Sequence, residues 1–105
     1  MAFDYRGLDW AIASALGDDT ALLSELHHAL VVDAKAAADL LHRSRCDANW
    51  NAAAGRLRGL ALSFGSTRLV KAAEMALNLA PGDPNSLKAV NRAIARLEAV
   101  PFPNR

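Results

Sequence analysis

Cysteine is almost absent from this sequence, and aromatic residues are scarce. The single cysteine, Cys46, excludes an internal disulfide and any metal site built from several cysteines. Aromatic residues make up only 6% of the chain, and the 52% of residues that are hydrophobic are mostly alanine and leucine. This composition favours helices over strands. In agreement, no segment alternates apolar and polar residues with the period of two that marks a half-buried strand.

Long apolar runs and an excess of either charge are also missing. No apolar run reaches the ~18 residues of a membrane span, and the opening segment MAFDYRGLDW lacks the apolar core of a signal peptide. Twelve basic and eleven acidic residues leave a net charge of +1, which gives no reason to expect nucleic acid or a membrane as a partner. We therefore expect a cytoplasmic protein, with no metal and no cofactor.

Glycine and proline are few, and they divide the chain into helical segments. The helices are expected at residues 9–16, 18–43, 47–64, 67–79 and 84–100. The expected N-terminal caps are Asp9, Asp18 or Asp19, Asp47, Ser66 or Thr67, and Asp83. Gly17 and Gly65 follow helix ends, the segment APGDPN forms a turn, and the tail PFPNR cannot continue a helix.

The expected fold is all-α. A length of 105 residues corresponds to one domain, residues 1–105. Long helices joined by short connectors predict an up-down antiparallel four-helix bundle with a short extra N-terminal helix. Trp10 and Trp50 are expected to pack where helices begin, at the ends of this bundle.

The segment expected to form the helix at 47–64 carries two adjacent stripes. The apolar stripe, which should face the core, comprises Ala54, Leu57, Ala61 and Phe64. The neighbouring stripe, which should point largely outward, comprises Gly55, Arg58, Gly59 and Leu62. Glycine costs a helix interior roughly 0.5–1 kcal/mol relative to alanine, so two glycines one turn apart suggest that another surface approaches the backbone here.

Basic residues are concentrated around the same stripe. Residues 48–73 contain four bases and no acid: Arg56, Arg58, Arg68 and Lys71. The first 40 residues, by contrast, contain seven acids and only two bases. The basic group either docks an acidic partner or is a solvated face that balances the acidic helix before it.

The segment GRLRGLALSFGS resembles the histidine-containing phosphotransfer (HPt) domain family. HPt domains are four-helix bundles whose third helix carries His-x-Leu-Lys-Gly, then four residues, an aromatic or aliphatic residue, Gly and a small residue. The matching positions are Leu57, Arg58 in place of the lysine, Gly59, Phe64, Gly65 and Ser66. The resemblance covers about residues 7–99, and Glu74 falls where the family often has Glu.

The position of the phosphorylatable histidine departs from the family pattern. Gly55 stands four residues before Gly59, where the family has the histidine that exchanges a phosphoryl group with a receiver-domain aspartate. Glycine offers no group that accepts phosphate. The resemblance therefore implies a non-enzymatic signalling module that binds a receiver or histidine-kinase domain without carrying phosphate at the usual site.

The expected partner-binding surface lies on the outward stripe of this helix. It comprises Gly55, Arg56, Arg58, Gly59 and Leu62, with Arg68 and Lys71 as a wider basic patch. The sequence also allows the two glycines to serve close packing between helices. The oligomeric state does not follow from these patterns.

Two other functions stay open. A true phosphotransfer protein would use one of three off-motif histidines, His27, His28 or His42. All three fall on the helix expected at residues 18–43, and its antiparallel register places none of them level with Gly55. They are expected to be ordinary surface or helix-end histidines. In the remaining alternative the bundle is only a structural or oligomerisation unit.

Overall fold

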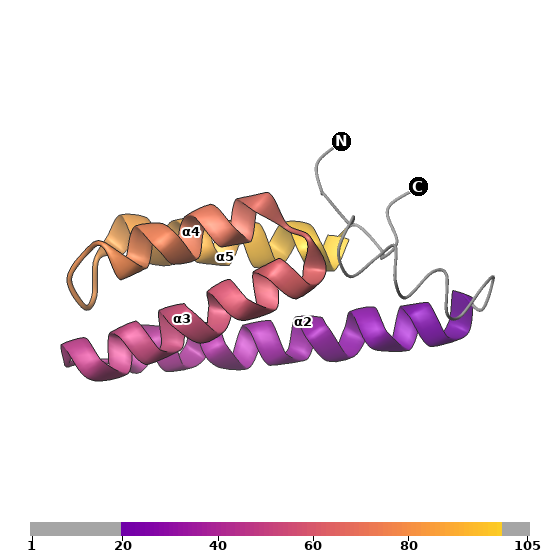
Figure 1. Ribbon diagram of the computed structural model, residues 1–105, viewed down its shortest axis with the longest axis horizontal. Coiled ribbons are helices and arrows are strands. Elements are labelled where there is room, and N and C mark those ends of the chain that lie inside the picture. Colours follow the sequence, from indigo (N-terminus) through magenta and orange to yellow (C-terminus); the bar gives the residue numbers. More distant parts are fainter. Residues whose placement is uncertain (1–19, 100–105) are drawn as a thin grey trace.

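The computed structural model describes residues 20–99, and these residues form four helices and no strand. The helices are α2 (Thr20–Arg43), α3 (Asp47–Phe64), α4 (Thr67–Leu77) and α5 (Pro84–Ala99), shown in Figure 1. The all-α expectation is thus confirmed for this part of the chain. The helix expected at residues 9–16, together with Trp10, lies outside the described residues.

The boundaries of α3 follow local sequence signals, with one correction. Cys46, rather than Asp47, is the N-cap residue, and its side chain makes no capping hydrogen bond. Asp47 instead lies in the first turn, where a carboxylate favours the positive end of the helix dipole. Gly65 ends the helix with φ 73°, in the left-handed region that glycine adopts without a steric penalty.

Side-chain caps begin α4 and α5. The Ser66 hydroxyl accepts the backbone N–H of Leu69 at 3.2 Å. Asp83 Oδ2 accepts both the backbone N–H and the hydroxyl of Ser86, each at 2.8 Å, and Pro84 takes the first helical position as expected. The end of α4 differs from expectation: α4 stops at Leu77 rather than Leu79. The backbone N–H of Leu79 donates to the Ala76 carbonyl, three residues back, instead of to the carbonyl four residues back.

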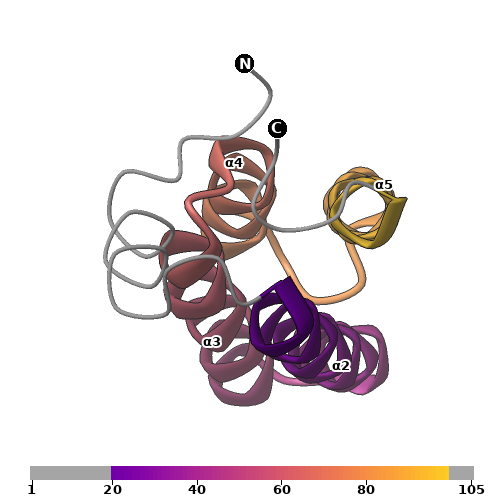
Figure 2. The same ribbon diagram turned by 90° about the vertical axis from the view of Figure 1, so that its right-hand side faces the viewer.

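Each helix packs against two others. α3 contacts α2 and α4, α5 contacts α4 and α2, and no contact joins α2 to α4 or α3 to α5 among the described residues. The view along the helices in Figure 2 shows this arrangement around a shared interior. The interior is filled from all four helices, so the outer faces of α3 and α5 look in different directions.

The core consists of a few large side chains set among alanines. The largest fully buried side chains are Trp50, Phe64, Leu41, Leu57, Leu69, Leu97 and Val90. Trp50 has no exposed surface, as expected, and its indole Nε1 donates to the Ala76 carbonyl of α4 at 2.6 Å. The buried aromatic thus has its polar atom satisfied, which ties the start of α3 to the end of α4.

The apolar stripe expected on the long helix α2 is also found in the structure. Leu23, Ala34, Ala37 and Leu41 are buried. Leu26 and Leu30 are half-buried and pack against the same core.

None of the described helices combines the length and the apolar character that a membrane crossing needs.

Candidate functional site

The outward stripe of α3 is open. Leu62 is 53% exposed, and both Gly55 and Gly59 are exposed. A Cβ atom added at either glycine would meet no atom of another described element within 4 Å. The glycines therefore do not serve close packing among α2, α3, α4 and α5.

The core stripe of the same helix is closed. Ala54, Leu57, Ala61 and Phe64 each have 0% exposure. The two stripes thus lie on opposite sides of a sharp boundary along α3, as the periodicity predicts. The core stripe packs against α2 and α4, and this packing leaves the outward stripe of α3 exposed to a partner.

Arg58 is held by a carboxylate on the neighbouring helix. Its Nε lies 3.1 Å from Glu74 Oε2 on α4, and the two side chains are 44% and 46% exposed. An exposed pair of this kind contributes only ~0–1 kcal/mol to stability. Its main effect is on charge, because Glu74 neutralises much of the positive field that Arg58 would otherwise present beside Gly59.

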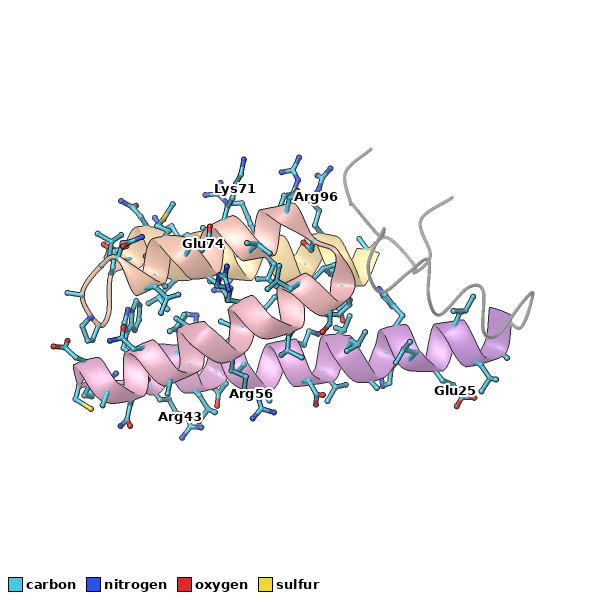
Figure 3. All side chains as sticks on the ribbon, viewed as in Figure 1. Glu25, Arg43, Arg56, Lys71, Glu74 and Arg96 are labelled. Atoms are coloured by element: carbon cyan, nitrogen blue, oxygen red, sulfur yellow. The ribbon has the colours of Figure 1, made fainter. Side chains whose placement is uncertain are left out.

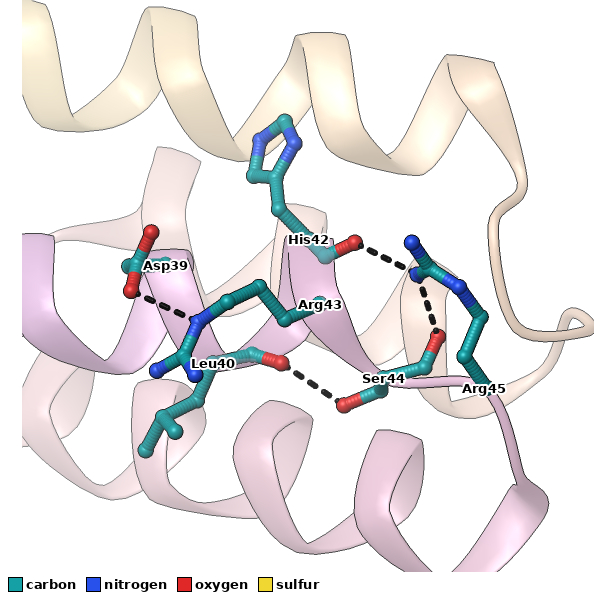
Figure 4. Close-up of polar contacts among 6 residues, drawn as sticks. All are labelled: Asp39, Leu40, His42, Arg43, Ser44 and Arg45. Atoms are coloured by element: carbon teal, nitrogen blue, oxygen red, sulfur yellow. Dashed lines mark hydrogen bonds and ion pairs between the residues drawn. The ribbon is translucent and has the colours of Figure 1, made fainter.

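Arg56 faces the groove between α2 and α3. This groove, of about 490 Å³, also includes Leu40, Arg43 and Ala52. Figure 4 shows that Arg43 is engaged by Asp39, one turn earlier on α2, with Nε 2.9 Å from Oδ2. Arg56 forms no ion pair with any described residue, so it is the free cation on this side of α3.

The connector between α2 and α3 is held by its own polar groups. Figure 4 shows Ser44 donating its hydroxyl to the Leu40 carbonyl at 2.7 Å, and Arg45 donating to the carbonyls of His42 and Ser44. These bonds satisfy carbonyls that the end of α2 leaves without helical partners. They hold the turn that sets the register of α3 against α2.

Arg68 and Lys71 line a different groove from Arg56. Both line a groove between α4 and α5, together with Arg92 and Arg96 of α5. Figure 3 shows Lys71 and Arg96 projecting from the upper edge of the molecule, whereas Arg56 projects from the lower edge. The basic residues of positions 48–73 thus have three different settings: the α2–α3 groove for Arg56, the ion pair with Glu74 for Arg58, and the α4–α5 groove for Arg68 and Lys71.

The three histidines differ from one another in their surroundings. His27 is not an ordinary surface residue: it is half-buried, its Nε2 lies 2.7 Å from the Leu97 carbonyl, and its ring meets Phe64 edge to face at 6.2 Å. His28 is exposed. His42, also exposed, has its Nε2 3.3 Å from Asn91 Oδ1.

Within residues 20–99, no three His, Cys, Asp or Glu side chains gather as they would around a metal ion.

The sequence analysis did not predict that α5 contributes Arg92 and Arg96 to a basic groove. The available signal was the spacing of Arg92 and Arg96 by one helical turn, which places both on one face.

Comparison with protein-family models, curated proteins and solved structures gives no match for this chain. The resemblance to HPt domains therefore depends on the residues of α3 and of its neighbouring helices.

Proposed function

We propose that this chain is a degenerate HPt-like signalling module that binds a receiver or histidine-kinase domain and accepts no phosphoryl group at the usual position. On this proposal the four helices form an up-down antiparallel bundle, with residues 9–16 as a short extra helix. The protein is not an enzyme and works in the cytoplasm as part of a phosphorelay.

The observation that carries the proposal is the open backbone at Gly55 and Gly59. Both positions are helical, exposed and uncrowded by any described element, so the packing of the four described helices does not require glycine there. Each glycine costs the helix roughly 0.5–1 kcal/mol. A partner surface that must approach α3 closely accounts for that cost.

The chemistry of the surface suits binding rather than transfer. Gly55 has no side chain to attack a phosphoryl group. Leu62 offers exposed apolar surface next to it, and Arg58 offers a guanidinium whose charge is partly neutralised by Glu74. Apolar contact would supply most of the affinity, while Arg58 would orient an acidic partner.

The off-motif histidines are weaker candidates for phosphoryl acceptance. His27 is half-buried, and its Nε2 is already in contact with the Leu97 carbonyl. Phosphorylation at this nitrogen would break that contact. His28 and His42 are exposed, but they lie on α2 and not on the stripe that matches the HPt motif.

A binding experiment tests the proposal. Purified receiver and histidine-kinase domains of the source organism are titrated with the wild-type protein, with Gly59→Leu, and with the control Asn85→Leu. Asn85 is exposed on α5, a helix that makes no contact with α3. We expect at least one domain to bind the wild type and Asn85→Leu equally and Gly59→Leu weakly, because a packed interface cannot absorb a new leucine.

The same proteins, incubated with a phosphorylated receiver, separate the alternatives. We expect no acid-labile phosphate on the wild-type chain. Phosphate on His27, His28 or His42 would instead establish a phosphotransfer protein. A chain that binds no receiver or kinase domain would be a structural or oligomerisation unit.

A further inference from the structure

The groove between α4 and α5 is lined by basic side chains above an apolar floor. Its volume is about 560 Å³. Ala72 and Ala93, both buried, form part of the floor, and Met75, 41% exposed, lies over it. The rims are formed by Arg68 and Lys71 on α4 and by Arg92 and Arg96 on α5.

No carboxylate lines this groove among the described residues. Residues 20–99 contain ten basic side chains, of which three form ion pairs: Lys35 with Glu98, Arg43 with Asp39, and Arg58 with Glu74. Seven remain without an ion pair to a described residue, and four of these seven line this one groove. The positive charge that is not balanced within the described fold is therefore concentrated here.

The spacing of the charges works against the stability of their own helices. Arg92 and Arg96 are one turn apart on α5, and Arg68 and Lys71 are three residues apart on α4. Like charges at these spacings repel each other and destabilise a helix. No ion pair to a described acid relieves this repulsion, so the arrangement favours an acidic molecule as its partner.

We propose that the α4–α5 groove binds an acidic amphipathic helix of a partner protein. Small floor residues let another helix approach α4 and α5 closely, as ridges pack into grooves. The lining runs from Arg68 to Met75 and from Ala89 to Arg96, about 10 Å along each helix, which is roughly two turns of a bound helix. The apolar stripe of that helix covers the alanines and Met75, and its carboxylates face the two basic rims.

This groove is distinct from the α3 surface of the proposed function. None of its lining residues belongs to α3, and the α3 surface contains no residue of α5. Binding at one surface therefore tests nothing about binding at the other, and the experiment below remains decisive if the HPt-like function fails.

The test uses the full chain and a display library of 18-residue peptides. The peptides have a fixed alanine and leucine helical frame, and the positions flanking the leucine stripe vary among Glu, Gln and Lys. We expect selection of Glu on both flanks. A selected peptide, made synthetically, should bind with an affinity that falls as salt rises. In NMR spectra it should shift the amides of residues 68–75 and 89–96.

Two double variants that each remove two positive charges identify the binding surface. Arg92→Gln/Arg96→Gln should weaken the peptide about tenfold, equivalent to ~1.4 kcal/mol, and should unfold at an equal or higher temperature because a repulsion is removed. Arg43→Gln/Arg56→Gln, whose two positions line the groove between α2 and α3, should bind the peptide as the wild type does.

Several results would overturn the proposal. These are a library that yields no binder, a preference for Lys or Gln at the flanks, equal loss of binding in both double variants, and shifts confined to α3. If the library selects no peptide but anionic lipid vesicles or single-stranded DNA bind tightly at this groove, the partner is another polyanion and not an acidic helix. If the wild type forms a dimer and Arg92→Gln/Arg96→Gln abolishes it, the partner at this groove is a second copy of this chain.

Discussion

Arg58 of α3 and Glu74 of α4 form an ion pair, with Nε 3.1 Å from Oε2, at the edge of the surface that carries Gly55 and Gly59. The residues are sixteen positions apart in sequence, and the turn at Gly65 brings them together. The pair gives Glu74 control over how much positive charge the α3 surface presents. It contributes little to stability because both side chains are about half exposed.

Glu74→Gln should remove the ion pair with Arg58 and leave the positive charge of Arg58 without a neighbouring carboxylate. We expect the free energy of unfolding to fall by no more than ~1 kcal/mol, measured by urea denaturation. Association with an acidic receiver domain should become faster at low salt, because the field of the surface becomes more positive. An unchanged association rate would mean that Arg58 lies outside the contact surface.

Arg58→Glu should have the opposite effect on binding. It places a second carboxylate beside Glu74 and like charge against an acidic partner, so the complex should weaken at low salt and recover part of the loss at high salt. Surface plasmon resonance at two ionic strengths measures both effects. A loss of affinity that does not depend on salt would point to a steric cause instead.

Alanine at the two glycines should stabilise the protein. Gly55→Ala and Gly59→Ala should each raise the free energy of unfolding by roughly 0.5–1 kcal/mol, because the added Cβ meets open space and alanine is the better helix former. Urea denaturation gives the values. A loss of stability in either variant would show that the glycine admits another part of this chain rather than a partner.

Gly55→His restores the residue that the HPt motif places before Leu57 and Arg58. The imidazole has room at this exposed position, so the fold should be retained. We expect the variant to acquire acid-labile phosphate from a phosphorylated cognate receiver, while Gly55→Gln, of similar size and without a nucleophilic ring, stays unlabelled. If both variants stay unlabelled with a receiver that binds them, the surface does not present the phosphoryl group as an HPt domain does.

Phe64→Ala should destabilise the fold strongly. Phe64 has no exposed surface and meets the ring of His27, so its removal leaves a cavity at a cost of ~3–5 kcal/mol. The matched control is Leu62→Ala on the same helix, where a 53% exposed side chain should cost under about 0.5 kcal/mol. Thermal unfolding followed by circular dichroism measures both. Similar losses in the two variants would contradict the boundary between the core and outward stripes of α3.

Local signals in the sequence predicted most helix boundaries. Gly65 ends α3 and Pro84 begins α5 as expected, because a left-handed φ and a fixed φ are properties of single residues. The error at Asp47 was one position, and the error at Leu77 was two. Both errors are at helix ends, where the last hydrogen bonds depend on local geometry that spacing along the chain does not define.

The periodicity of α3 likewise predicted which residues are buried. Ala54, Leu57 and Phe64 are fully buried, and Gly55 and Gly59 are exposed, because a helix with one apolar stripe can bury only that stripe. The sequence by itself therefore determined the helical structure of residues 20–99 and the open stripe on α3.

Only the tertiary structure decided how charges from different helices meet. Arg58 finds Glu74, Lys71 faces a groove shared with Arg96, and His27 reaches the Leu97 carbonyl seventy positions away. Charge counts along the chain had placed Arg58 and Lys71 in one patch. The ion pair of Arg58 and the groove that Lys71 shares with α5 both depend on the packing of α4 between α3 and α5, which the spacing of charges along the chain does not define.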